Sequence, residues 1–270
     1  MKILITGSSG FVGKSLVNFL SRKHQIVKYD LKNGQDVLDE KMLFKKLKNV
    51  DLVIHLAAFI SASESWDKPS DYLRNNALGT LSVVRNSIKT NVKKIIFFSS
   101  AAVKATPLTP YAVSKIAAES ICGLYKNDIN IVIVRPENIY GSGQKEAYGY
   151  VIHSFIRAIK GGQPVKIYGD GNQTRDFIYI DDIITTVNKM VGMNIKSGTV
   201  ISLGTGKAVK IVNLAKKVAK IMNVKLKAEY CEARPEPKNS KADLAIVRKM
   251  GLKPEIFLDI EKGIKKLLMT

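Results

Sequence analysis

The sequence predicts an α/β fold in which a doubly wound parallel sheet carries helices on both faces and a smaller C-terminal lobe completes the chain. Short apolar runs typical of buried strands occur at 3–5, 25–29, 52–55, 94–98 and 130–134. Amphipathic segments with helical spacing lie between them, at 12–22, 41–47, 72–90 and 111–127. Strands that alternate with helices of this length form a parallel sheet, and its ligands sit beyond the carboxyl ends of the strands.

The alternation breaks after about residue 138. Glycine, tyrosine and polar residues are frequent in 141–171, and a strand–helix pattern returns at 177–191, followed by a strand at 199–203. From about residue 207 we expect helix and loop. The sequence therefore predicts a Rossmann-type domain from residues 1–138 plus 177–206, and a second lobe from residues 139–176 plus 207–270.

Composition excludes several classes of protein. The chain has 270 residues, of which 46% are hydrophobic and 24% charged, as in ordinary globular proteins. No apolar run approaches the roughly 18 residues of a membrane span, and Met1-Lys2 leads straight into a short strand instead of a signal peptide. Cys122 and Cys231 lie outside any metal-ligand spacing, so we expect no metal and two free thiols in a reducing, cytoplasmic compartment.

The formal net charge of +20 is strongly basic. In the helical segment 211–222, however, lysines fill the positions between the apolar residues, which is typical of a solvated helix face. The sequence has no zinc-finger spacing and no interleaving of aromatic and basic residues. We therefore expect no nucleic-acid partner, and an anionic small substrate fits the charge better.

The first functional motif is a glycine turn between a strand and a helix, Thr6-Gly7-Ser8-Ser9-Gly10-Phe11-Val12-Gly13. Gly7 permits the tight turn, Gly10 lets the backbone approach a pyrophosphate, and Gly13 allows the helix to pack closely on the strand. The opening amides of the helix, at Phe11 and Val12, face the phosphates. This arrangement predicts a dinucleotide site.

A carboxylate ends the second strand, at Asp30. Its oxygens can accept hydrogen bonds from the adenosine ribose hydroxyls, and its negative charge repels a 2′-phosphate. The dinucleotide is therefore predicted to be NAD and not NADP.

The second functional motif is Tyr111-Ala-Val-Ser-Lys115. Thr109 is a good N-cap and Pro110 suits the first helical position, so Tyr111 and Lys115 lie on one helix face, four residues apart. A nearby ammonium lowers the pKa of a tyrosine, as an acid–base residue for an alcohol requires. Ser100, at the end of the strand 94–98, supplies a hydroxyl for the same alcohol.

These motifs resemble the extended short-chain dehydrogenase/reductases of the NAD-dependent epimerase/dehydratase family, and most closely the UDP-glucose 4-epimerases. The resemblance extends over nearly the whole chain through further segments: His55-Leu-Ala-Ala58, Asn76-Ala-Leu-Gly79-Thr80, Arg135-Pro-Glu-Asn138-Ile-Tyr-Gly141, 168–177, Arg234-Pro235 and Ala242-Asp243.

The resemblance implies site residues beyond the two motifs. For the cofactor it implies adenine contacts at Asp36 and Val37, a lining at Leu56, Ala57 and Ala58, and contacts from Asn76, Tyr111 and Lys115. For the diphosphate of a nucleotide sugar it implies Asn138, Arg175 and Arg234 in the second lobe, and guanidinium forks suit phosphate oxygens. It also implies a homodimer through the helices 76–90 and 111–127.

The activity that the resemblance implies is epimerization at the sugar 4-position through a transient 4-keto sugar, catalysed by Tyr111 with Ser100 and Lys115. Family members that eliminate water or carbon dioxide usually carry an acidic residue just after the serine, where this chain has Ala101 and Ala102. A nucleotide-sugar reductase or dehydratase on the same scaffold remains an alternative. A non-catalytic NAD-binding regulatory protein is a second one.

Three departures from the family pattern concern the substrate. Glu137 replaces a commonly apolar residue beside the nicotinamide. Ser240 stands where relatives often carry a bulky tyrosine, and this small residue leaves an N-acetylated sugar as a further candidate substrate. Only ten residues separate Ser100 from Tyr111.

His55 ends a buried strand, where a satisfied core histidine is favoured over a catalytic base.

Overall fold

The computed structural model describes residues 1–144, 150–233 and 236–269, and the chain divides into two compact units. Unit 1 comprises 1–104, 108–135 and 184–201, and unit 2 comprises 105–107, 136–183 and 202–270. The strand–helix segment from residue 177 to 183 groups with unit 2. The division expected from the sequence stays a prediction.

Unit 1 is built on a parallel sheet with the strand order β2-β1-β3-β4-β5-β9. Its strands are β1 (Lys2–Thr6), β2 (Gln25–Tyr29), β3 (Leu52–His55), β4 (Lys94–Phe98), β5 (Asn130–Pro136) and β9 (Val200–Leu203). The predicted strands are confirmed to within two residues at each end. Because β2 and β3 flank β1 on opposite sides, the strand order reverses beside β1, where doubly wound sheets bind their ligands.

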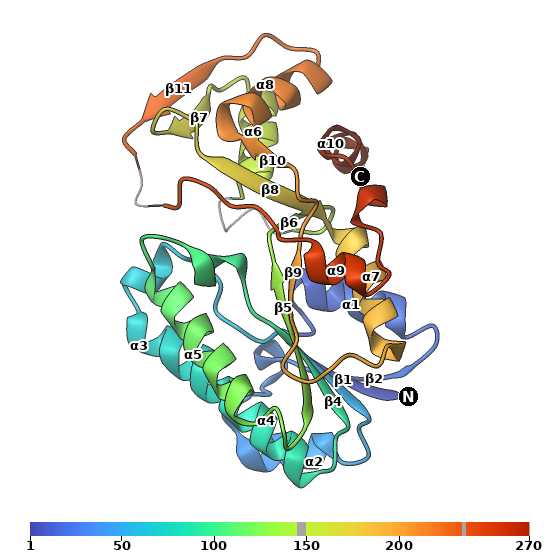
Figure 1. Ribbon diagram of the computed structural model, residues 1–270. Coiled ribbons are helices and arrows are strands. Elements are labelled where there is room, and N and C mark those ends of the chain that lie inside the picture. The colour runs from blue at the N-terminus through green and yellow to red at the C-terminus, as the bar shows by residue number, and fades with distance from the viewer. Residues whose placement is uncertain (145–149, 234–235, 270) are drawn as a thin grey trace. The chain divides into compact units, whose positions relative to one another are not determined.

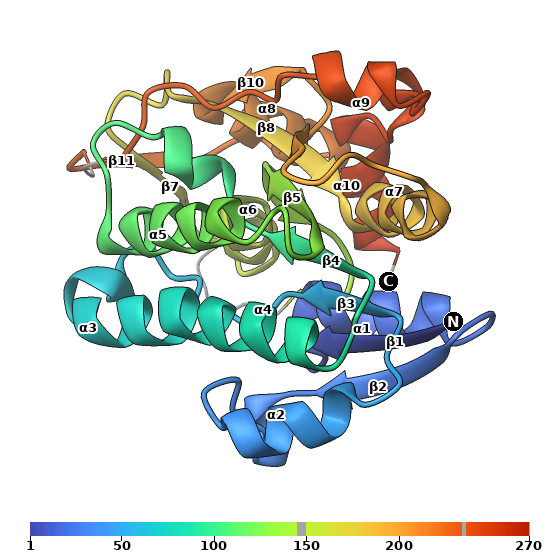
Figure 2. The ribbon, with the colours of Figure 1, turned by 60° about the horizontal axis from the view of Figure 1, so that its bottom comes forward.

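Apolar side chains cover both faces of this sheet. The helices of unit 1 are α1 (Phe11–Leu20), α2 (Glu40–Leu47), α3 (Pro69–Tyr72), α4 (Gly79–Lys89), α5 (Pro110–Leu124) and most of α7 (Ile180–Gly192). One core cluster joins strand residues such as Val53 and Ile95 to Leu43 of α2, Val83 of α4 and Ala118 of α5. Figure 2 shows α4 and α5 side by side in this unit. Burial on both faces is the reason why the central strands β1, β3, β4 and β5 are almost continuously apolar, whereas the edge strand β2 is partly exposed.

The segment predicted as one helix, 72–90, is divided in the structure. After α3 the chain forms a π-helical turn, Leu73–Leu78, before α4 begins. π-Turns are rare and occur often at functional sites, because the wider turn redirects a side chain. Here the turn contains Asn76.

Unit 2 is smaller and contains helices together with short parallel and antiparallel strands (Figure 1). Strand β8 (Thr174–Tyr179) pairs in parallel with β6 (Asn138–Tyr140) and antiparallel with β10 (Ala208–Lys210), and β7 (Val165–Tyr168) pairs with β11 (Ala228–Cys231). The helices of this unit are α6 (Val151–Lys160), α8 (Ile211–Ile221), α9 (Ala245–Lys249) and α10 (Ile260–Leu268). Helix α8 contacts both α6 and α10.

The expectation of helix and loop alone after residue 207 was wrong, because β10 and β11 lie there. Both are strands of three or four residues at the edge of a sheet, and most of their residues are exposed. Such strands carry no apolar alternation by which a sequence could reveal them. Among the described residues, no helix is both long enough and apolar enough to cross a membrane.

Candidate active site

The glycine turn has the geometry that the motif predicts. Gly7 follows β1 with a φ of +67°, a conformation that favours glycine. A Cβ atom on Gly13 would lie 2.1 Å from the carbonyl oxygen of Gly7, so any side chain there would force the helix away from the strand. Gly10 is the N-cap of α1, and no side chain in the described structure caps this helix end. The amides of Phe11 and Val12 therefore open a helix whose positive end suits a pyrophosphate.

Asp30 lies beside this turn at the end of β2. One carboxylate oxygen accepts a hydrogen bond from the backbone N–H of Ser9 at 2.7 Å, and the other accepts one from the backbone N–H of Lys32 at 2.9 Å. These bonds fix the carboxylate next to the turn and leave lone pairs for ribose hydroxyls. The buried hydroxyl of Ser8 has no hydrogen-bond partner among the described residues, which suits a turn that receives a polar ligand. The residues present thus fit a dinucleotide.

Asp36 and Val37, the expected adenine contacts, follow the short 3-10 helix Leu31–Asn33. The Asp36 carboxylate accepts from the backbone N–H of Leu38 at 2.9 Å, and its carbonyl oxygen accepts from the Tyr29 hydroxyl at 2.7 Å. Val37 is buried, and its methyl group would be 2.8 Å from a Cβ atom on Gly79. The structure therefore fixes this segment against α4, and the adenine contact stays a prediction.

His55 is a satisfied core residue, as expected. Its Nδ1 lies 2.7 Å from the Thr6 hydroxyl and its Nε2 lies 3.0 Å from the Thr80 hydroxyl. Thr80 donates its own proton to a backbone carbonyl, so Nε2 carries the imidazole proton and Nδ1 accepts from Thr6. Burial lowers the pKa of His55 to about 3, so the ring is neutral at physiological pH.

The loop after β3, predicted to line the cofactor, is fixed by the same hydroxyl. The backbone N–H groups of Leu56 and Ala57 both donate to Thr6 Oγ1, each at 3.1 Å. A Cβ atom on Gly7 would lie 2.8 Å from the nitrogen of Ala57. The loop Leu56–Ala58 and the glycine turn therefore lie side by side at the carboxyl ends of β1 and β3.

Asn76 has a different immediate task from the cofactor contact that the sequence predicted. Its amide oxygen accepts from the backbone N–H of Phe59 at 2.8 Å and from the Asn75 side chain at 2.9 Å. Its amide nitrogen donates to the Phe59 carbonyl and to the Ser114 hydroxyl, both at 2.9 Å. All four hydrogen-bonding positions of this buried amide are thus used. Asn76 thus fixes the backbone of Phe59, just after the loop Leu56–Ala58, and the cofactor contacts of this loop and of Asn76 stay predictions.

Tyr111 lies in the first turn of α5, where Thr109 caps the helix by accepting from the N–H of Ala112 at 3.2 Å. Its ring packs edge-on against Tyr72, with ring centroids 6.3 Å apart, and only 9% of the residue is exposed. Ser114 donates to the Tyr111 carbonyl at 2.7 Å. The phenol is therefore held by a rigid helix end and an aromatic neighbour.

Lys115 and Ser100 lie at the carboxyl end of β4. The Lys115 ammonium donates to the carbonyl of Phe98, the last residue of β4, at 2.8 Å. Burial lowers the pKa of Lys115 to about 8, so it is cationic at neutral pH. The Ser100 hydroxyl accepts from the N–H of Ala102 at 3.1 Å, a bond that does not use its own proton. Unit 1 thus brings the Ser100 hydroxyl and the Lys115 ammonium to the end of β4, and Tyr111 lies four residues before Lys115 in the same helix.

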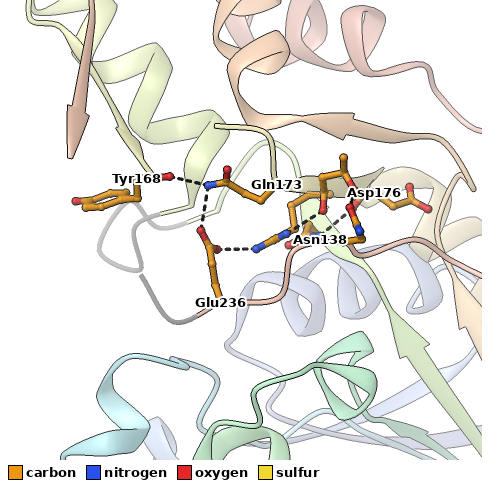
Figure 3. Close-up of polar contacts among 8 residues, drawn as sticks. Asn138, Tyr168, Gln173, Asp176 and Glu236 are labelled. Carbon is orange, nitrogen blue, oxygen red and sulfur yellow. Dashed lines mark hydrogen bonds and ion pairs between the residues drawn. The ribbon is translucent and has the colours of Figure 1, made fainter. Parts of the chain in front are cut away.

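In unit 2, Asn138 and Arg175 lie at the beginning of the neighbouring strands β6 and β8. The Asn138 side chain donates to the carbonyl of Asp176 at 2.9 Å, and Arg175 forms an ion pair with Glu236 at 2.6 Å (Figure 3). The carboxylate of Asp176 is fully buried and accepts four hydrogen bonds, from the residues 205, 206 and 242. These bonds fix the backbone that presents Arg175. Arg234, also predicted to hold the diphosphate, lies outside the described residues.

Two contacts in unit 2 were missed at the sequence level. Glu236 binds Arg175, and the hydroxyl of Ser240 donates to the carboxylate of Glu137. Each pair joins residues far apart in the chain, so spacing gives no sign of it. The only available signal was charge, because Glu236 is a carboxylate two residues after an arginine that is expected to bind phosphate.

The chain matches known proteins over nearly its whole length. A solved UDP-N-acetylglucosamine 4-epimerase from Methanobrevibacter ruminantium M1, in complex with UDP-N-acetylmuramic acid, is 29% identical, with a TM-score of 0.90 over 99% of this chain and 97% of that chain. A UDP-glucuronic acid 4-epimerase from Bacillus cereus, in complex with UDP-glucuronic acid and NAD, is 28% identical, with a TM-score of 0.91 over 99% and 98%. A UDP-glucuronate 4-epimerase from Thermodesulfobacterium geofontis is 29% identical over 97% of this chain and 94% of its own length.

These similarities confirm the predicted Rossmann-type fold and the prediction of an NAD-dependent nucleotide-sugar enzyme. The matching family is the NAD dependent epimerase/dehydratase family, and its match covers residues 3–204. That range includes the glycine turn, the loop after β3 and the tyrosine–lysine motif. The chain belongs to the NAD dependent epimerase/dehydratase family.

Proposed function

We propose that this protein catalyses the NAD-dependent 4-epimerization of a nucleotide sugar, a UDP-hexose, through a transient 4-keto sugar. The observation that carries the proposal is the Lys115 ammonium at the carboxyl end of β4, with Ser100 following the same strand and Tyr111 four residues before Lys115 in α5. A module that only binds NAD does not need all three groups. The two alanines after Ser100 leave no carboxyl group there for eliminating water, which disfavours a dehydratase.

Each residue of the set has a chemical role. The chemistry that bound NAD supplies is the reversible oxidation of the sugar C4. Tyr111, as the phenolate, accepts the proton of the sugar 4-hydroxyl and returns it once the 4-keto group is reduced. Ser100 hydrogen-bonds the same oxygen, and the positive charge of Lys115 favours the phenolate.

The residues of the glycine turn would hold the pyrophosphate of NAD, and Asp30 would accept its adenosine ribose hydroxyls. Lys115 would also bind the nicotinamide ribose. The glycine geometry and the fixed carboxylate support these assignments.

The diphosphate of the substrate would be held by Asn138, Arg175 and Arg234 in unit 2. Strong contacts at the diphosphate lie away from the reacting carbon, so the 4-keto sugar can turn while the nucleotide stays bound. The small Ser240 supports acceptance of an N-acetylated sugar in addition to glucose and galactose.

We further propose a cytoplasmic homodimer that pairs through α4 and α5. Several apolar residues of the π-turn and α5 are exposed, namely Leu78, Val113 and Leu124. Both cysteines are free thiols, as in a reducing compartment. Light scattering coupled to size-exclusion chromatography measures the mass directly, and a monomeric mass contradicts the dimer.

The deciding experiment incubates the purified, NAD-loaded protein with UDP-glucose, UDP-galactose, UDP-N-acetylglucosamine and UDP-glucuronate, and resolves the product sugars. We expect a 4-epimer from at least one substrate with no net change in NAD. Tyr111→Phe should lose activity by about 10²- to 10⁴-fold, because it removes the acid–base group. Tyr125→Phe, at the other end of α5, is the matched control and should keep it.

The rival activities give different products. A dehydratase releases a stable keto sugar, and a reductase consumes added NADPH. A regulatory NAD-binding protein converts none of the sugars, and its Tyr111→Phe variant behaves like the wild type. Any of these results contradicts the proposed epimerase.

A further inference from the structure

Unit 2 contains a small anion site that the chain fills with its own carboxylate. Arg175 donates from one terminal nitrogen to the carboxylate of Glu236 at 2.6 Å. Gln173 donates to the other carboxylate oxygen at 3.1 Å, and the same amide also donates to the carbonyl of Tyr168 at 2.8 Å. Both oxygens of Glu236 are thus bound by side chains from one stretch of chain, at the start of β8 (Figure 3).

This site is suited to phosphate. A guanidinium group is always charged and binds the oxygens of a carboxylate or of a phosphate by the same fork of N–H donors. The second terminal nitrogen of Arg175 donates to the carbonyl of Thr174 at 2.8 Å, which holds the guanidinium in place. The Arg175 side chain is 12% exposed and that of Glu236 is 37% exposed. The arginine is therefore the fixed partner and the glutamate is the accessible one.

A diphosphate cannot share Arg175 with Glu236 at little cost. The pair is neutral, so it offers little attraction to an incoming anion, and the carboxylate repels the phosphate oxygens at short range. When the Glu236 carboxylate moves away from the terminal nitrogen of Arg175, the positive charge of Arg175 is available to the ligand. Binding of a diphosphate is thus coupled to release of Glu236.

The chain that follows Glu236 is anchored, so the release is local. The N–H of Thr174 donates to the carbonyl of Lys238 at 2.9 Å, and the N–H of Ser240 donates to the carbonyl of Thr174 at 3.1 Å. The N–H of Asp176 also donates to the carbonyl of Ser240 at 3.1 Å. Residues 238–240 are thus anchored on β8, and a rotation of the Glu236 side chain frees the terminal nitrogen of Arg175 that it holds.

We propose that Glu236 is an internal competitor that occupies the diphosphate position on Arg175 and leaves when a nucleoside diphosphate binds. The inference rests on the proposed function, which places the substrate diphosphate at Arg175. In this role Glu236 lowers the affinity for the substrate, and its ion pair with Arg175 breaks only when the ligand binds.

Calorimetric titration of the NAD-loaded protein with UDP tests the proposal. We expect Glu236→Gln to bind UDP about fivefold more tightly than the wild type, the factor that corresponds to a partly exposed ion pair of about 1 kcal/mol. Glu232→Gln removes the same charge from an exposed position four residues away and should bind UDP as the wild type does. Arg175→Gln should weaken binding, and Arg175→Gln combined with Glu236→Gln should bind no more tightly than Arg175→Gln alone.

Equal binding by Glu236→Gln overturns the proposal, because Glu236 would then not compete with the ligand. Weaker binding overturns it as well, because Glu236 would then orient Arg175 for the ligand. An equal gain in Glu232→Gln overturns it as well, since a general charge effect would explain the result. If neither the wild type nor Glu236→Gln binds UDP, the diphosphate does not bind at Arg175 and the proposal fails. Sugar conversion is assayed separately, so tight UDP binding without any 4-epimer contradicts the epimerase while the competition at Arg175 stands.

Discussion

The ammonium of Lys115 donates to the carbonyl oxygen of Phe98 across 2.8 Å, and so ties helix α5, which carries Tyr111, to the end of β4. The lysine is 3% exposed, and burial lowers its pKa to about 8. An ammonium that titrates in this range is charged at neutral pH and loses its charge in mild alkali. Its charge is available to Tyr111 only below that pH.

The first prediction is an alkaline limit to activity. We expect kcat/KM of the wild type to fall above about pH 8, approaching tenfold per pH unit, as Lys115 loses its proton. Lys115→Met should be slower at every pH, should lose this limit, and should need a higher pH to deprotonate Tyr111. Initial rates between pH 6 and 10 measure these effects.

The thermal stability of Lys115→Met distinguishes a loss of activity through the missing charge from a loss through unfolding. The folded pKa of Lys115 lies below its unfolded value, so the unfolded chain binds more protons between about pH 8 and 10.5, and the buried lysine opposes folding at neutral pH. Lys115→Met should therefore melt at the same temperature as the wild type or higher. A lower melting temperature together with an unchanged pH profile would contradict a role for its charge.

The fold of unit 1 could be predicted because its central strands are buried on both faces. Continuous apolar runs, a glycine turn and a carboxylate at the end of β2 are local signals, and they predicted the strands and the cofactor site. The edge strands β10 and β11 could not be found this way, because they have only three or four mostly exposed residues. The π-turn at Asn76 was also missed, since its sequence continues the helical spacing.

The site in unit 2 was less predictable for a different reason. Arg175 was found by resemblance, but Glu236 lies 61 residues away in the chain and Ser240 lies 103 residues from Glu137. Sequence spacing carries no information on such pairs. Only the fold brings the members of each pair together.

A second prediction concerns the glycine turn. Gly13→Ala would place a Cβ atom 2.1 Å from the carbonyl oxygen of Gly7, so the turn must shift. We expect NAD affinity to fall at least about tenfold and the protein to lose about 1–3 kcal/mol of stability. Gly123→Ala in α5 is the control, because its Cβ meets nothing within 4 Å, and alanine in a helix is favoured by up to about 1 kcal/mol. Calorimetry with NAD and thermal unfolding measure both, and equal behaviour of the two variants would refute the packing argument.

A third prediction concerns the choice of cofactor. Asp30→Asn keeps the shape of the side chain and an oxygen for the N–H of Ser9, but removes the charge that repels a 2′-phosphate. We expect the ratio of NAD to NADP affinity to fall about tenfold, the effect of roughly 1.4 kcal/mol. Asp128→Asn removes the same charge from an exposed loop and should leave the ratio unchanged. Competitive titration of the two dinucleotides gives the ratio, and a ratio unchanged in Asp30→Asn would show that Asp30 does not select the cofactor.

The last prediction concerns the sugar. The Ser240 hydroxyl donates to the carboxylate of Glu137, a residue that is 9% exposed. The family resemblance implies that Glu137 lies beside the nicotinamide and that Ser240 stands where relatives often carry a bulky tyrosine, so we expect the sugar to approach this carboxylate. A uronate sugar would bring a second carboxylate toward it, and two like charges at a shielded site repel each other. We therefore expect the wild type to prefer UDP-glucose over UDP-glucuronate, and Glu137→Gln to reduce that preference about fivefold, as the loss of about 1 kcal/mol of repulsion gives.

Two controls distinguish this charge effect from a change of shape. Ser240→Ala removes the donor but keeps the carboxylate of Glu137, so it should retain the preference for UDP-glucose. Glu232→Gln removes an exposed charge elsewhere in unit 2 and should also retain it. The measurement is kcat/KM for both sugars in all four proteins. If Glu137→Gln keeps the preference of the wild type, the carboxylate of Glu137 does not face the sugar, and substrate choice must be set by other residues.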